Sequence, residues 1–221
     1  LRVIPAFASG LDARPAVKAF FMDRGEPIVD AVVSLTGFSL VGGPAYNDTD
    51  AAQEMLEALD VPYLAVQGLE FQSLQDWESS SMGLMPVEAT MMVAIPELDG
   101  ATGSMVFGGR SELSAGEKFD MQPAPERIDR LADRVARLVA LRHTPIAERT
   151  VAIVLFNFPP NSGAAGTAAH LSVFESLFNT LSAMREEGYH VDLPDSHAEL
   201  RDAILKGNAK QFGAEANVFQ R

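Results

Sequence analysis

The stretch "PIVDAVVSLTG" (Pro27 to Gly37) is the part of the sequence that decides the fold class. It is rich in Val and ends at Gly, a pattern typical of a strand buried in a sheet. A helical pattern follows over residues 51–60, with Asp48 or Thr49 as its cap, and "VPYLAVQ" (61–67) is the next strand-like run. Strands that alternate with a helix predict a parallel sheet with covering helices.

The residues on either side extend this alternation. The apolar run "RVIPAFA" (2–8) predicts a buried strand, and Pro15 begins a helix that runs to about Arg24. We therefore expect a Rossmann-like or flavodoxin-like α/β fold, with ligands beyond the carboxyl ends of its strands. The other expected elements are a short helix over 73–81, a helix or turn over 86–96, a strand over 104–110, a surface loop over 111–124, a helix over 125–143, strands over 150–159 and 190–194, and helices over 167–187 and 197–207.

The chain is expected to contain two α/β units. The composition changes near residues 144–149, so we expect residues 1–146 to form a Rossmann-like unit and residues 147–221 to begin a second, incomplete one. The chain starts without Met and enters a strand-like run at once. We therefore expect it to be part of a larger multidomain subunit.

The composition is that of a globular protein and excludes several functions. The 221 residues are 47% hydrophobic and 21% charged. A net charge of −13 argues against a general nucleic-acid binder, which would be basic. The sequence has no Cys, so it can form no disulfide, thiolate metal site or cysteine nucleophile. It also has no apolar run of the ~20 residues that a membrane-spanning helix needs.

A glycine-rich loop, "PPNSGAAG" (159–166), precedes the expected helix over 167–187. Its spacing matches neither a Walker A motif nor GxGxxG, so a nucleotide site has little support. Gly163 and Gly166 permit positive φ or close backbone approach, and the amides up to Thr167 suit a carboxylate, a phosphate or a packed neighbouring domain. His170 falls in the first turn of the expected helix, where it faces either a ligand or solvent.

A pair of acidic residues follows an apolar stretch in "PELDG" (96–100). Glu97 and Asp99 are carboxylates, which are natural ligands of Mg²⁺ and bases for removing protons. An exposed turn has the same pattern. A second glycine-rich segment, "LTGFSLVGGPA" (35–45), lies at the carboxyl end of an expected strand, and a simple turn is its alternative. The four His residues lack metal-ligand spacing, and no GxSxG supports a hydrolase.

The expected helix over 125–143 carries a basic stripe beside its apolar one. Glu126 with Arg130, and Asp133 with Arg137, have the i,i+4 spacing of helical salt bridges. This pattern favours an exposed, salt-bridged face, and a partner-docking face is the alternative. The stripe consists of Arg127, Arg130, Arg134 and Arg137.

Seven stretches of the chain, taken together, resemble the large porphyrin-binding H subunit of magnesium chelatase, and less closely the large subunit of cobaltochelatase. They occur in the family's order and cover nearly the whole chain. The sharpest are "LTGFSLVGGPA", "PELDG" and the "FPP…G..GTAA" loop with its later "EGY". The others are "VIPAFASGLD", "VPYLAVQ", "FGGR" and "RIDRLADRVARLVALR". The acidic balance and short loops favour the bacteriochlorophyll branch.

The resemblance implies an internal segment of an enzyme that binds protoporphyrin IX and inserts Mg²⁺ into it during chlorophyll or bacteriochlorophyll biosynthesis. It also implies two ATPase-type partners, the I and D subunits, that hydrolyse ATP, which agrees with the lack of an ATP motif in this chain. The implied location is the bacterial cytoplasm, with membrane association of the complex left open.

Metallation of a porphyrin removes two pyrrole protons, strips water from Mg²⁺ and requires the propionates to be held. With the resemblance, Glu97 is predicted to act as the base or to deliver the metal, with Asp99 as its support. Arg110, or the amides of the loop from Gly163 to Thr167 (with Gly166 among them), would receive a propionate. His170 is a lesser candidate.

Two alternatives stay open at this point. One is a scaffold or partner-docking module of a cobaltochelatase-like large subunit, and the other is a free-standing flavodoxin-like ligand binder.

Overall fold

The computed structural model describes residues 1–43, 46–113, 117–156, 166, 168 and 170–212. The chain divides into two compact units, Leu1–Arg142 and His143–Arg221. The assignment of 1–146 and 147–221 as two α/β units stays a prediction.

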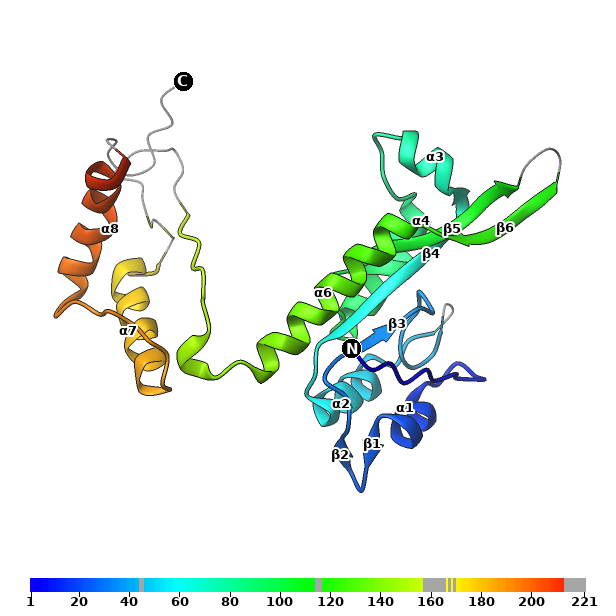
Figure 1. Ribbon diagram of the computed structural model, residues 1–221, viewed down its shortest axis with the longest axis horizontal. Helices are drawn as coiled ribbons and strands as arrows, with labels where there is room; N and C mark the ends of the chain where they lie inside the picture. Colours follow the sequence, from blue (N-terminus) through cyan, green and yellow to red (C-terminus); the bar gives the residue numbers. More distant parts are fainter. Residues whose placement is uncertain (44–45, 114–116, 157–165, 167, 169, 213–221) are drawn as a thin grey trace. The chain divides into compact units, whose positions relative to one another are not determined.

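The first unit is built on a four-stranded sheet with the order β3-β4-β5-β6 (Figure 1). Its first three strands are parallel, and the last pair is antiparallel. The predicted α/β fold with a parallel sheet is therefore confirmed. The strands are β3 (Val32–Ser34), β4 (Tyr63–Ser73), β5 (Met105–Leu113) and β6 (Glu117–Pro123).

A small hairpin precedes this sheet. Its strands β1 (Met22–Asp23) and β2 (Glu26–Pro27) pair antiparallel. Arg24 and Gly25 form the two-residue turn, and both have positive φ, 52° and 89°. Two consecutive positive φ values are typical of a type I′ turn, whose twist matches that of the paired strands.

The helices of the first unit include the predicted α2, which begins and ends as its sequence indicates. The Asp48 side chain accepts a hydrogen bond from the Ala51 amide at 3.1 Å, and Asp60 ends the helix with φ 44°. These helices are α1 (Arg14–Phe20), α2 (Thr49–Leu59), α3 (Leu74–Ser79), α4 (Pro86–Glu88), the π-helix η1 (Ala89–Ala94), α5 (Ile95–Leu98) and α6 (Pro125–His143).

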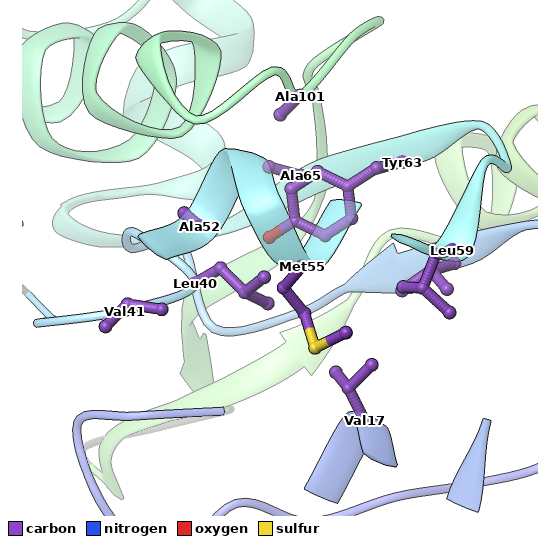
Figure 2. Packing of buried hydrophobic residues seen from close by; sticks show 10 residues of the cluster. Val17, Leu40, Val41, Ala52, Met55, Leu59, Tyr63, Ala65 and Ala101 are labelled. Carbon is purple, nitrogen blue, oxygen red and sulfur yellow. The ribbon is translucent and has the colours of Figure 1, made fainter. Parts of the chain in front are cut away.

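The main core lies between α2, α1 and the start of β4. Met55 and Leu59 of α2 are buried together with Val17 of α1 and with Tyr63 and Ala65 of β4 (Figure 2). A smaller core forms around Leu69, Leu74, Val106 and Ala124. Because β4 lies between two strands and is covered by helices, nearly all of its first seven residues are buried, as is typical of a central parallel strand.

Four expectations for the first unit are wrong in part or whole. The helix expected from Pro15 to about Arg24 ends at Phe20, and the chain turns back in the β1–β2 hairpin. The strand expected over 27–37 is confined to β3, and Pro27 belongs to β2.

Residues 2–8 form no strand and are mostly exposed. Pro5 removes an amide donor from the middle of this run, and that loss disfavours a sheet ladder. Residues 111–124, expected as a loop, contain β6. Among the described strands it pairs with β5 alone, and such an edge strand needs only a weak apolar alternation.

The second unit contains η2 (Ile146–Glu148), α7 (Val173–Glu186) and α8 (His197–Phe212). The strands predicted over 150–159 and 190–194 are absent from its described residues, and residues 157–159 lie outside them. An apolar run becomes a strand only when a neighbour supplies hydrogen-bond partners. Instead Val151, Ile153, Val154 and Phe156 are exposed. In the described part of the chain, no helix has both the length and the apolar content to cross a membrane.

Candidate functional site

The two carboxylates of "PELDG" have opposite environments. Glu97 lies in α5 and is exposed, whereas Asp99 follows α5 and is only 1% exposed. The sequence predicted a joint role for the pair. The structure instead gives one solvent-facing carboxylate and one buried carboxylate, separated by a single residue.

Asp99 holds the glycine-rich loop that leaves β3. Its Oδ2 accepts a hydrogen bond from the Ser39 hydroxyl at 2.7 Å and another from the Leu40 amide at 2.8 Å. Among the described residues, its Oδ1 has no hydrogen-bond partner. Burial raises the pKa of Asp99, and the hydrogen bonds from Ser39 and Leu40 oppose this rise. Asp99 therefore anchors a loop and does not face solvent as a ligand would.

Glu97 lies on a turn whose backbone is fixed by contacts on both sides. Pro96 beside it is fully buried, and the side-chain amide of Gln53 in α2 donates to the Leu98 carbonyl at 3.1 Å. Asp99 anchors the turn from its other side. An exposed carboxylate on such a support has a defined position, which a general base or a metal-delivering group requires.

A π-helix leads into this turn. The segment from Pro86 to Leu98 is one continuous helical stretch, and six of its residues, Ala89–Ala94, have π geometry. The stretch was expected to end at Pro96 and runs two residues further. Pro96 has no amide to donate, and its ring crowds the preceding turn, so a widened turn before it relieves the clash. Segments of π-helix are frequent at functional sites.

Glu88, which sequence reasoning missed, fastens the start of this helix to β4. It is completely buried, and its Oε2 accepts hydrogen bonds from the Met85 amide at 3.0 Å and from the Gln72 side chain. A detectable pattern was present, because Pro86 at the first helical position and an acidic residue two positions later are typical of a capped helix start.

The loop over 35–43 depends on close backbone packing. Gly42 has φ +114°, and a Cβ built on it would lie 2.1 Å from the carbonyl oxygen of Tyr46. Only Gly fits such a position. The Ser39 hydroxyl oxygen also accepts a hydrogen bond from the Val41 amide at 3.3 Å, so the loop has one tightly packed shape. The glycines in this segment therefore do more than form a simple turn.

The residues predicted to hold propionates are found in three different situations. Arg110 lies exposed in β5, and its guanidinium donates to the Glu70 carbonyl at 3.2 Å. Gly163 and Thr167 lie outside the described residues. Gly166 is buried with φ +68°, and its amide donates to the Phe156 carbonyl at 2.8 Å. That amide is therefore already paired.

His170 was expected in the first turn of a helix beginning at 167, and this placement is wrong. The helix, α7, begins at Val173, so His170 lies before it, exposed and with φ 61°. Among the described residues before α7, Ala168 and Leu171 form an isolated antiparallel bridge. Within the described residues, no three His, Asp or Glu side chains gather as a metal site would require, so the metal role of Glu97 stays a prediction.

The sheet order, the anchored glycine-rich loop and the exposed carboxylate beside it define an α/β protein of the parallel-sheet class. Its candidate site lies at the loop after β3. The chain belongs to the CobN/Magnesium Chelatase family, whose model matches residues 1–220. The predicted family resemblance is thus confirmed.

Individual relatives agree with this assignment. The chain is 54% identical to the magnesium-chelatase H subunit of Cereibacter sphaeroides, over 99% of this chain and 19% of that protein. It is 39% identical to the chloroplastic magnesium-chelatase ChlH subunit of Oryza sativa, over 100% of this chain and 16% of the relative. The catalytic subunit of cobaltochelatase from Mycobacterium tuberculosis has the same fold, with a TM-score of 0.67 and 30% identity over 90% of this chain and 17% of that one.

The chain thus spans about a fifth of the length of the curated relatives it matches. The higher identity to the bacterial protein than to the plant protein agrees with the predicted bacteriochlorophyll branch.

Proposed function

We propose that this chain is a segment of the porphyrin-binding subunit of a magnesium chelatase, which inserts Mg²⁺ into protoporphyrin IX during bacteriochlorophyll or chlorophyll biosynthesis. The observation that carries the proposal is the 54% identity to a magnesium-chelatase H subunit across 99% of the chain. The identity to the cobaltochelatase structure is 30%, so Mg²⁺ is favoured over Co²⁺ as the metal substrate.

The proposal includes partner proteins, which are separate subunits. Two ATPase-type partners, the I and D subunits, hydrolyse the ATP that drives insertion, and the complex works in the cytoplasm or associates with a membrane surface. Mg²⁺ and protoporphyrin IX are both substrates.

Glu97 is the proposed base or metal-delivering group. Insertion exchanges one Mg²⁺ for the two pyrrole protons, so the charge of the tetrapyrrole is unchanged and each proton needs an acceptor. An exposed carboxylate on this fixed turn can take one of them, or replace a water molecule that Mg²⁺ releases slowly. Asp99 is buried, so its proposed role is to position the turn and the loop over 35–43.

The propionates need cationic or amide donors. Arg110 is the proposed guanidinium partner, because it is exposed and because a guanidinium carries five N–H donors in a geometry that matches a carboxylate. The segment with Gly163, Gly166 and Thr167 is the proposed amide partner, with His170 beside it. Since the Gly166 amide is paired with Phe156, this role rests on the neighbouring amides.

The test is Glu97→Gln in the full-length protein, assayed for chelation with both ATPase partners and, separately, for porphyrin binding. Loss of a general base slows a reaction by about 10²–10⁴-fold, so we expect chelation to fall by at least about 100-fold while porphyrin affinity is kept. Glu54→Gln, at an exposed site in α2, is the matched control and should leave both unchanged. Normal chelation by Glu97→Gln would remove the base assignment.

A further inference from the structure

The basic stripe on α6 lines a cleft. A hollow of about 600 Å³ lies between α6 and the residues that lead into β5. Four of the chain's seventeen Lys and Arg residues line it, although the chain has a net charge of −13. Asp133 is the acidic residue of the lining. The lining includes Arg127, Arg130, Arg134, Arg137, Ser104, Met105, Leu138 and Leu141.

The four guanidinium groups keep most of their hydrogen-bonding capacity. Arg130 binds Glu126, and Arg134 donates to the Gly103 carbonyl at 2.8 Å. Arg127 lies over the Trp77 ring at 5.4 Å, and its buried Nε has no described partner. The predicted pair of Asp133 and Arg137 does not form, and within the described residues the Arg137 side chain has no ion pair or hydrogen bond. Each guanidinium has five N–H donors, so many remain for an incoming acceptor.

The length of the stripe decides what kind of anion fits. Arg127 and Arg137 are ten residues apart on one helix, and a rise of 1.5 Å per residue separates them by about 15 Å along the axis. A single phosphate or a small carboxylate cannot reach both. An extended chain with several carboxylates can, because alternate side chains on one of its faces are about 7 Å apart.

The far end of the cleft has a different character. Leu138 and the half-exposed Leu141 lie there, one and four residues beyond Arg137. An anion alone would leave these side chains uncovered. A polypeptide with acidic residues followed by an apolar one matches both parts of the lining.

We infer that this cleft is a docking site for an acidic segment of a partner protein, bound along α6 with its carboxylates on the arginine stripe and an apolar side chain on Leu138 and Leu141. This inference does not depend on the proposed role of Glu97. It needs no porphyrin and no metal, so either one can fail while the other stands.

The test uses a fluorescein-labelled oligoglutamate peptide that ends in Leu, titrated into the full-length protein and followed by fluorescence anisotropy. Arg134→Gln combined with Arg137→Gln should weaken binding about tenfold, because each exposed ion pair contributes modestly. Added salt should weaken binding of the unmodified protein. Arg201→Gln combined with Lys206→Gln is the matched control, because it removes two positive charges from exposed positions on α8.

Three results would overturn the inference. They are no binding by the full-length protein, an equal loss in the control variant, and competition by citrate as strong as that by the peptide, which would make the cleft a small-anion site. If the double variant unfolds, Arg137→Gln alone replaces it. Its side chain makes no described hydrogen bond or ion pair, so the helix does not depend on it, and affinity should still fall about threefold.

Discussion

The Asp99 carboxylate accepts a hydrogen bond from the Ser39 hydroxyl at 2.7 Å, and this contact joins two segments that are sixty residues apart in the chain. Both segments belong to stretches that carry the family resemblance, the glycine-rich loop after β3 and the "PELDG" turn after the π-helix. The contact is buried, so solvent does not weaken it. The exposed Glu97 is therefore tied, through Asp99, to the end of the parallel sheet.

Ser39→Ala should lower the free energy of unfolding by about 2 kcal/mol, since a hydrogen bond to a charged group contributes about 1.5–3 kcal/mol. The change leaves the buried Asp99 carboxylate with the Leu40 amide as its one described donor. Urea unfolding of the chain measures this loss. Ser79→Ala is the control, because Ser79 is exposed and its hydroxyl has the Asp76 carbonyl as its one described partner. Equal effects of the two changes would mean that the buried contact adds nothing.

Asp99→Asn should change the pH dependence of stability. The folded-state pKa of Asp99 is raised above 3.8, so its contribution to stability is fully present below pH 3.8 and is lost as pH rises through the folded-state pKa. Asn does not titrate. The stability of the unmodified chain relative to Asp99→Asn should therefore be greatest at acid pH and decline toward neutrality. Urea unfolding of both proteins across this range measures the difference, and a constant difference would contradict the prediction.

Gly42→Ala should destabilise the chain by more than about 1 kcal/mol, because Ala is strained at positive φ. Here φ is +114°, and the new Cβ would also lie 2.1 Å from the Tyr46 carbonyl oxygen. Gly10→Ala is the control, since its Cβ would meet nothing within 4 Å and its φ lies outside the positive region. Thermal unfolding of the two variants compares them. Similar midpoints would show that the loop adapts to a side chain.

The central elements were predictable because their patterns are local. The Val-rich run before Gly37, the Asp48 cap and the stripe of Met55 and Leu59 each lie within a few residues, and each has one dominant interpretation. The order of strand, helix and strand then indicates a parallel pair, because the crossover helix returns the chain to the same end of the sheet, and the crossover is right-handed. These predictions required no knowledge of distant contacts.

The arrangement of the candidate site depends on contacts between segments that are far apart in the sequence, and for this reason the sequence predicted the site incompletely. Nothing near "PELDG" shows that Asp99 turns inward to meet Ser39 while Glu97 faces solvent, since an exposed turn has the same composition. Two apolar runs were wrongly predicted as strands for a related reason. Residues 2–8 and 150–156 have the composition of strands, but a strand also needs a neighbour with which to pair.

Glu88→Gln should cost about 1–3 kcal/mol in the free energy of unfolding, because it replaces one unpaired carboxylate oxygen by an NH₂ group whose two buried donors have no described acceptor. Glu88 accepts from the Met85 amide and the Gln72 side chain through one oxygen, and its other oxygen has no described partner. A Gln amide placed there would bury an unpaired NH₂ group. Glu78→Gln, at an exposed position in α3, is the control for urea unfolding. If both variants unfold alike, Glu88 does not fasten the helix to β4.

Tyr63→Phe should leave stability at neutral pH unchanged or slightly raised, and should protect the chain at alkaline pH. Tyr63 is buried, and its hydroxyl has no partner within hydrogen-bonding distance and angle among the described residues, so removing it leaves no described group unpaired. Burial raises the pKa of Tyr63 from 10.0 to about 12; the Asp99 carboxylate acts in the same direction, and the Ser34 hydroxyl opposes them.

Because the folded-state pKa lies above the unfolded one, the stability contributed by Tyr63 is present below pH 10 and is lost as pH rises toward 12. The unmodified chain should therefore lose up to about 2 kcal/mol relative to Tyr63→Phe across this range. Urea unfolding at neutral and alkaline pH measures the loss. Tyr46→Phe removes an exposed phenol and serves as the control. An equal alkaline gain in both variants would mean that burial does not hold the Tyr63 proton.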